Sequence, residues 1–202
     1  MIPYEVGKET VRKELQALQA FYEGMAYDYF REAVELILAA EERGGRVHVT
    51  GVGKPRHVGK KIAATLQSTG TRAYFLDPVD CVHGDSGGVA PGDVVIAISH
   101  SGKTGELLAA VETVKRNGAS VIAIVGDRES GLAKMADVVL HVPVSEEAGP
   151  LGLAPTSSTT CQLAVGDGLA MALEWARGFT EEDFKRYHPG GSLGVLLEQH
   201  KV

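Results

Sequence analysis

The feature of the sequence that most restricts its fold is a set of five short apolar runs, most of them separated by stretches with helical periodicity. The runs are Arg46–Thr50, Ala73–Leu76, Val94–Ile98, Val121–Val125 and Val138–Val142. Runs this apolar are typical of strands covered on both faces, and helices between them imply parallel pairing through right-handed crossovers. The sequence therefore predicts an α/β fold, a doubly wound three-layer α/β/α sandwich around a five-stranded parallel sheet.

The same patterns divide the chain into three parts within a single domain. N-terminal helices are expected at 5–44, the sheet core at 46–177 and tail helices at 180–202, the last of them after Gly191. Apolar residues recur at helical spacing in the first helix: Val11, Leu15, Leu18 and Tyr22. This stripe favours packing on another subunit, and packing on the helix's own domain is the alternative.

Composition excludes several classes of protein. The chain has 202 residues, 44% of them hydrophobic, and a net charge of −6, which disfavours nucleic acid or an anionic membrane as the main partner. With only Cys81 and Cys161, no secretory signal and no long apolar span, neither a disulfide framework nor a membrane protein is expected. We therefore expect a cytoplasmic protein.

A polar loop follows the third apolar run and opens onto a helix-patterned segment. It reads Ser-His-Ser-Gly-Lys-Thr-Gly-Glu over residues 99–106. Hydroxyls and free backbone N–H groups at a helix N-terminus can hold a phosphate monoester without a metal ion. The alternative is an ordinary capped helix, with Ser101 or Gly102 as the N-cap and Glu106 as a favourable first-turn acid.

The loop also resembles the phosphosugar loop of the sugar isomerase (SIS) domain family, which reads Ser-x-Ser-Gly-x-Thr-x-Glu. Further stretches are similar to one branch of that family, the D-arabinose 5-phosphate isomerases. They are Gly-x-Gly-Lys at 51–54, residues 61–70, His-Gly-Asp at 83–85, residues 147–160, and Arg-Gly-Phe-Thr at 177–180 through His-Pro-Gly-Gly at 188–191. So many motifs in order are far more specific than any one of them.

The resemblance implies a flavodoxin-like SIS domain that forms a homotetramer with its pockets at subunit interfaces. The positions that match the family's catalytic residues are Lys54, Glu106, Glu147 and His188. Candidate contacts to the sugar phosphate are Gly53, His83, Ser99, His100, Ser101, Gly102, Thr104 and Ser157. Long members of the branch continue into a pair of CBS domains, so we expect a short form without them.

Two departures from the branch's pattern bear on the substrate. Pro55 and Arg56 stand where the family usually has serine and glycine. Lys103 replaces a usual glutamate, and His100 a usual asparagine or glutamine. These loop changes add potential positive charge near a phosphate, which would tighten anion binding or favour a more highly charged ligand.

The chemistry implied is aldose–ketose isomerisation through an enediol, with a small sugar phosphate as the partner and no cofactor or metal ion. Glu147 or Glu106 would move the proton, and Glu147 is favoured because Glu106 also complements the charge of its helix terminus. Lys54 would stabilise negative charge on oxygen, and His188 would open the sugar ring or shuttle protons.

Two alternatives to D-arabinose 5-phosphate isomerisation remain open. One keeps the reaction and changes the substrate, to a hexulose 6-phosphate or a sedoheptulose 7-phosphate. The other is a non-catalytic sensor of a sugar phosphate or nucleotide sugar, against which stand the four matched catalytic positions.

Overall fold

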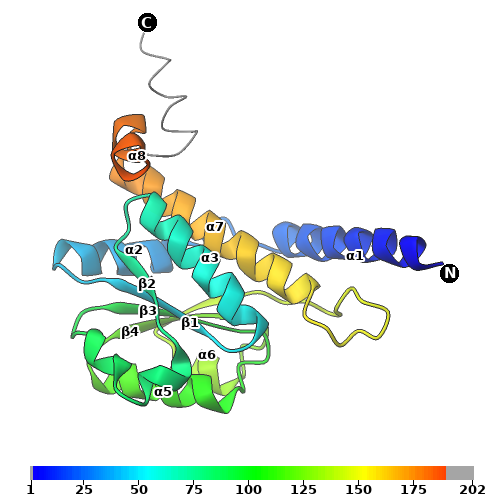
Figure 1. Ribbon diagram of the computed structural model, residues 1–202, viewed down its shortest axis with the longest axis horizontal. Helices are drawn as coiled ribbons and strands as arrows, with labels where there is room; N and C mark the ends of the chain where they lie inside the picture. The colour runs from blue at the N-terminus through cyan, green and yellow to red at the C-terminus, as the bar shows by residue number, and fades with distance from the viewer. Residues whose placement is uncertain (1, 190–202) are drawn as a thin grey trace, which may run out of the picture.

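The computed structural model describes residues 2–189 and contains a five-stranded parallel sheet (Figure 1). Its strands are β1 Val47–Gly51, β2 Ala73–Phe75, β3 Val94–Ser99, β4 Ser120–Val125 and β5 Val138–His141. They pair in the order β2-β1-β3-β4-β5, and every pairing is parallel. This is the flavodoxin-like order, so the predicted fold class and all five strands are confirmed.

Helices cover both faces of the sheet. Their bounds are α1 Pro3–Glu23, α2 Arg31–Glu42, α3 Lys54–Ser68, α4 Pro78–Cys81, α5 Gly105–Arg116, α6 Gly131–Met135, α7 Ser157–Arg177 and α8 Glu181–Tyr187, with a 3₁₀ helix η1 at Asp85–Gly88. The final helix expected after Gly191 lies outside the described residues.

Two apolar cores hold the layers together, one on each face. Alternate strand residues such as Val49 and Ile96 pack against α2, α3 and α7. The residues between them, such as Val95 and Ala97, pack against α4, α5 and α6. The alternation follows from the two-residue period of a strand, and because both faces are covered the strands read as continuous apolar runs.

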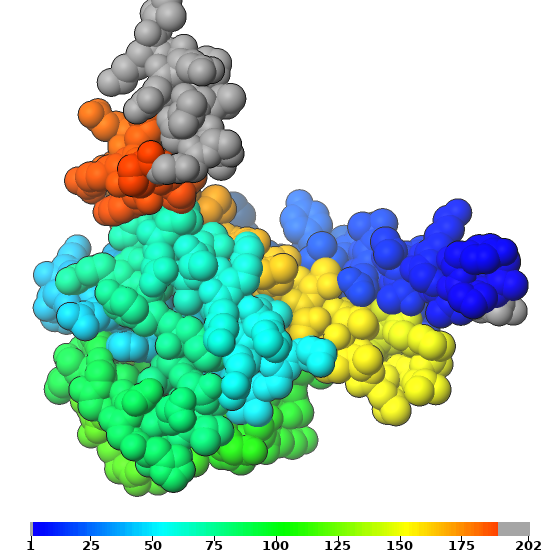
Figure 2. Space-filling model, viewed as in Figure 1, coloured from blue at the N-terminus to red at the C-terminus, as the bar shows by residue number. Residues whose placement is uncertain are grey.

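The first helix packs on its own domain over only part of its length. Its C-terminal end is anchored in the core on α7 through buried Phe21, with Leu18 packed beside it. Its free end reaches out from the body of the molecule next to the loop that follows β5 (Figure 2). On that part Val11 and Leu15 are 69% and 64% exposed, so much of its apolar stripe is uncovered within one chain.

Within residues 2–189, no helix is both long and apolar enough to cross a bilayer. In the same part of the chain, no three His, Cys, Asp or Glu side chains form a group that could hold a metal ion.

Candidate active site

A pocket of about 570 Å³ lies at the carboxyl ends of β1 and β3, where ligands bind in doubly wound sheets. Seven of the residues singled out from the sequence line it: Gly53, Lys54, Ser99, His100, Ser101, Thr104 and Glu147. The structure adds nine more: Val52, Pro55, Val144, Ser145, Glu146, Gly152, Leu153, Pro155 and Ser158.

The loop after β3 is closed by its own hydroxyls. Ser99 Oγ accepts a hydrogen bond of 3.1 Å from the Gly102 N–H, and Ser101 Oγ accepts one of 3.3 Å from the Lys103 N–H. Each serine oxygen accepts here, so its own hydrogen remains available to donate to a ligand. Helix α5 starts at Gly105 with Thr104 as its N-cap, later than the Ser101 or Gly102 cap considered from the sequence.

Three helix N-termini meet at this pocket. Lys54 is the first residue of α3, Thr104 caps α5, and Ser158 is the second residue of α7, and all three line the pocket. The helix dipoles and unpaired N–H groups at such termini attract negative charge. The pocket is therefore built to receive anionic groups, with the exposed ammonium of Lys54 adding a full positive charge.

One of these termini is already occupied by an anion of the chain itself. Glu147 Oε2 accepts hydrogen bonds from the backbone N–H groups of Thr156 and Ser158, at 2.7 and 3.2 Å. Burial alone would raise the pKa of Glu147, but hydrogen bonds from Ser158 and Thr156 outweigh it and hold that pKa below its ordinary value. Glu147 is thus a carboxylate at neutral pH, which leaves α3 and α5 for an anionic ligand.

Five of the residues singled out from the sequence lie outside the pocket lining of a single chain: His83, Gly102, Glu106, Ser157 and His188. Gly102 is buried behind the loop against Ser130. Ser157 is also buried, and its hydroxyl has no partner among the described residues. Glu106 is exposed on the first turn of α5, and His83 is exposed between α4 and η1.

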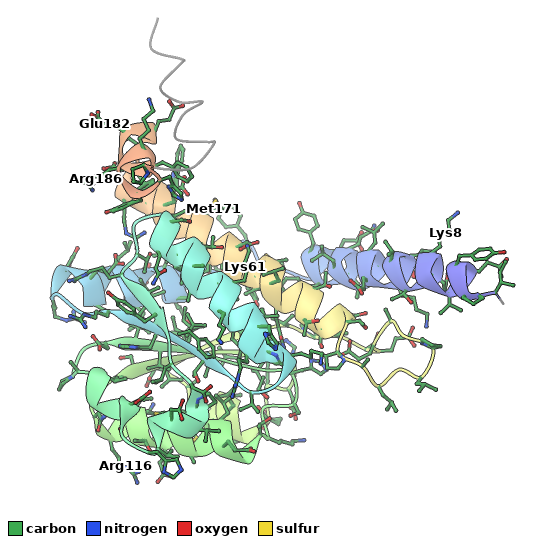
Figure 3. The ribbon with its side chains drawn as sticks, viewed as in Figure 1. Lys8, Lys61, Arg116, Met171, Glu182 and Arg186 are labelled. Carbon is green, nitrogen blue, oxygen red and sulfur yellow. The ribbon has the colours of Figure 1, made fainter. Side chains whose placement is uncertain are left out.

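His188 lies at the opposite end of the molecule from Glu147. It follows α8, which comes after the C-terminal end of α7 and is marked by Glu182 and Arg186 in Figure 3. The 21 residues of α7 span about 30 Å, and Glu147 caps their N-terminal end. Tyr187 lines a small cavity with Gln67 at the C-terminal end of α3, the helix that Lys54 begins.

The two unusual cations beside the pocket are paired with aspartates and lie outside its lining. Arg56 binds Asp77 at 3.0 Å, and Lys103 binds Asp127 at 3.3 Å. Each charge has an aspartate as a near neighbour, and for Lys103 this offsets the added positive potential expected from the sequence. Pro55 and His100, by contrast, do line the pocket.

The residue that sequence reasoning missed in this site is Ser158. Residues 156–160 are five consecutive hydroxyl residues that the sequence does not distinguish, and Ser157 was the one predicted to contact the ligand. The Oγ of Ser158 donates a close hydrogen bond to Glu147 Oε1. Which hydroxyl reaches the pocket depends on the residue at which α7 begins, and boundaries are the least certain part of a sequence-based assignment.

Residues 41–172 match the SIS domain family. The chain belongs to this family. Among curated SIS proteins, the arabinose 5-phosphate isomerase KdsD of Pseudomonas aeruginosa is 54% identical over 170 residues, which cover 84% of this chain and 51% of that protein. KdsD of Salmonella typhi is 48% identical over 193 residues, covering 96% and 58%. The chain thus spans about half the length of these relatives.

One solved structure matches this chain over its own full length. A protein of Escherichia coli CFT073, solved in complex with arabinose 5-phosphate, superposes with a TM-score of 0.87 at 38% identity, and the match covers 94% of this chain and 100% of that one. A phosphoheptose isomerase from Francisella tularensis shares the fold at a TM-score of 0.72 and 19% identity, over 87% of this chain and 100% of that one.

Proposed function

We propose that this SIS domain is an aldose–ketose isomerase that interconverts D-arabinose 5-phosphate and D-ribulose 5-phosphate through an enediol. The observation that carries the proposal is the shared pocket, in which the hydroxyl loop and the N-terminus of α5 lie with Lys54 and the carboxylate of Glu147. The similarity to proteins named arabinose 5-phosphate isomerase, and to the structure solved with arabinose 5-phosphate, supports this substrate.

In this proposal the phosphate binds the loop after β3. Ser99, Ser101 and Thr104 donate hydroxyl hydrogens to its oxygens, and the α5 N-terminus adds backbone N–H groups. Binding at this end, remote from the reacting carbons, orients the sugar and supplies energy for the chemical step.

Glu147 is the base we propose for proton transfer. It removes the proton from C2 of the open-chain aldose, the C2–H electrons form the C1–C2 double bond, and the C1=O π electrons move to O1, which takes up a proton. O2–H then gives up a proton in place of the one taken up at O1, its bonding electrons form the ketone at C2, and the C1–C2 π electrons take the proton back from Glu147 at C1. Lys54 stabilises the negative charge that develops on oxygen. The exposed position of Glu106, outside the lining, favours Glu147 for this role.

His188 acts from a neighbouring subunit in this proposal. Its Nδ1 donates a hydrogen bond of 2.8 Å to the Phe184 carbonyl, so in the neutral ring Nε2 is the nitrogen with the lone pair that ring opening or a proton shuttle requires. Because His188 and Glu147 are at opposite ends of one chain, the complete site needs a second copy. The exposed apolar residues of α1 are consistent with the homotetramer that the family resemblance implies.

The proposed product, D-arabinose 5-phosphate, is the starting material for a further biosynthetic step. D-Arabinose 5-phosphate is a precursor of the eight-carbon acid sugar Kdo, and we propose that the enzyme supplies it in the cytoplasm. Pro55 lines the pocket where the family usually has serine, and this difference is the reason to test another ketose phosphate as the substrate. A hexulose 6-phosphate or a sedoheptulose 7-phosphate is therefore included in the assay that tests the substrate.

The test is a coupled assay of the wild type and Lys54→Ala on pentose, hexose and heptose phosphates. We expect wild-type protein to prefer ribulose 5-phosphate among the ketoses. Lys54→Ala should lose about 10²- to 10³-fold in kcat, because it removes a donor to the developing oxyanion. Lys103→Ala is the matched control: its ammonium is paired with Asp127 outside the pocket, so kcat/KM should stay within about fivefold of wild type.

Two results would contradict the proposal. Faster turnover of another ketose phosphate would replace the substrate and keep the reaction class. No turnover of any member, together with tight binding of one of them, would make the protein a sensor.

A further inference from the structure

Four hydrogen bonds hold the carboxylate of Glu147, and all of their donors come from two residues at the start of α7. Oε2 accepts from the N–H and Oγ1 of Thr156, at 2.7 and 3.2 Å, and from the N–H of Ser158 at 3.2 Å. Oε1 accepts from Ser158 Oγ. Both oxygens are therefore oriented, and Ser158 is the residue that binds both of them.

We infer that Ser158 is a positioning residue for proton transfer, because its hydroxyl and N–H fix the Glu147 carboxylate at the pocket wall. The inference rests on the proposed role of Glu147 as the base. Ser158 is 1% exposed, and it lines the pocket beside the carboxylate it binds. A buried hydroxyl with a charged acceptor is held in one rotamer, so it restricts the carboxylate in turn.

The neighbouring serine provides the contrast. Ser157 is also 1% exposed, but its Oγ has no hydrogen-bond partner in the described part of the chain. Successive helix residues point about 100° apart, so only one of the two hydroxyls can reach Glu147. Ser157 and Ser158 are therefore a matched pair: they are equally buried, and only Ser158 contacts Glu147.

The contact has a consequence for the pH dependence of catalysis. Donors to a carboxylate stabilise its ionised form, so removal of the Ser158 hydroxyl raises the pKa of Glu147. The titratable groups near Glu147 are Lys54, His100 and Glu146 in the pocket lining and Cys161 on α7, and Lys13 of α1 binds Glu146 at 3.2 Å. None of these changes in a Ser158 variant, so a shift of the acidic limb reports the lost hydrogen bond.

The experiment measures kcat and kcat/KM for D-arabinose 5-phosphate against pH in Ser158→Ala, Ser157→Ala and wild type. In Ser158→Ala we expect the acidic limb to move to higher pH and the plateau kcat to fall about 10- to 100-fold through misplacement of the base. In Ser157→Ala the acidic limb should stay at its wild-type position, because the Ser157 hydroxyl makes no hydrogen bond to Glu147. Ser158→Cys, a weaker donor of similar size, should lie between the two and covers the case that the alanine variant does not fold.

A second measurement separates failure of this inference from failure of the proposed function. The carboxyl ¹³C signal of Glu147, assigned with Glu147→Gln, is titrated in wild type and Ser158→Ala without substrate. An unchanged midpoint overturns the inference whatever the activity. A midpoint at higher pH, with full activity retained by Glu147→Gln, supports the contact and removes Glu147 from the proposed mechanism.

Discussion

Gly102 shows how one residue holds the loop after β3 in place. Its φ is +63°, a conformation that favours glycine, and a Cβ at this position would lie 2.1 Å from Ser130 Oγ and 2.8 Å from Val125 Cγ2. Its carbonyl accepts a 3.0 Å hydrogen bond from the Leu132 N–H of α6. Although Gly102 lies outside the pocket lining, the position of the Ser99 and Ser101 hydroxyls depends on it.

The prediction for this position compares Gly102→Ala with Gly105→Ala. The first should lower the free energy of unfolding by about 1–3 kcal/mol and weaken phosphate binding, because strain and overpacking both displace the loop. A Cβ at Gly105 meets no atom within 4 Å, and φ there is not positive, so that variant should stay within about 1 kcal/mol of wild type. Urea unfolding and inorganic phosphate titration measure the two effects. Equal behaviour of the two variants would contradict the explanation.

Asp93 joins the amino ends of two central strands. Its carboxylate is 3% exposed and accepts from the N–H groups of Arg46 and Ala90, at 2.8 and 2.9 Å, and pairs with His48 Nε2 at 3.0 Å. Burial would raise the pKa of Asp93, but these three interactions outweigh it and lower that pKa. The register of β1 against β3 is thus tied to the charge of one buried side chain.

Removal of that charge should destabilise the protein in a pH-dependent way. Asp93→Asn should lower the free energy of unfolding by about 2 kcal/mol at pH 7. Because the pKa of Asp93 is lower in the folded than in the unfolded state, its contribution is fully present above the unfolded value and is lost as pH falls through the folded one. The gap between variant and wild type in urea unfolding should therefore be constant from pH 7 to about 5 and shrink toward pH 3.

The control for this measurement is Asp80→Asn, which changes an exposed carboxylate on α4. It should alter the free energy of unfolding by less than about 0.5 kcal/mol at either pH. A gap for Asp93→Asn that is independent of pH down to 3 would show that the loss comes from packing and not from charge.

Within one chain, the proposed catalytic groups lie in two places that are far apart. Lys54 and Glu147 share one pocket, whereas His188 follows α8 at the far end of α7. The exposed part of α1 includes Lys8, labelled in Figure 3, and carries Val11 and Leu15 uncovered by the rest of the chain. These features suit an assembly in which one subunit's α8 approaches another subunit's pocket.

Subunit complementation tests this arrangement. Glu147→Gln and His188→Ala should each be inactive alone, and co-expression should restore activity, because mixed oligomers contain some sites with both residues intact. Glu147→Gln with Lys54→Ala is the matched control: both residues belong to the pocket of one chain, so every mixed site lacks one of them and no recovery is expected. A wild-type mass equal to that of one 21.4 kDa chain, with full activity, would contradict the shared site.

The pocket-forming loops illustrate how much of the site could be predicted from the sequence. Three candidate residues come at or after the carboxyl ends of strands: Ser99 ends β3, and Lys54 and Glu147 follow β1 and β5. Because the carboxyl ends of parallel strands meet at one edge of the sheet, their convergence was predictable. Ser158 was not predictable, because a shift of one residue in the start of α7 exchanges it with Ser157. The pairing of Arg56 with Asp77 was hidden for a related reason: the partners are 21 residues apart and meet only after α3 and β2 have packed together.

The layers, the parallel pairing and the pocket's location were predictable from the amino-acid order, because they follow from apolar periodicity and the handedness of crossovers. Three features became known from the folded chain alone: which hydroxyl binds Glu147, that Arg56 and Lys103 pair with aspartates, and that His188 lies far from the pocket of its own chain. Those outcomes depend on side-chain direction and on distances between segments remote in sequence, which are set when the layers pack.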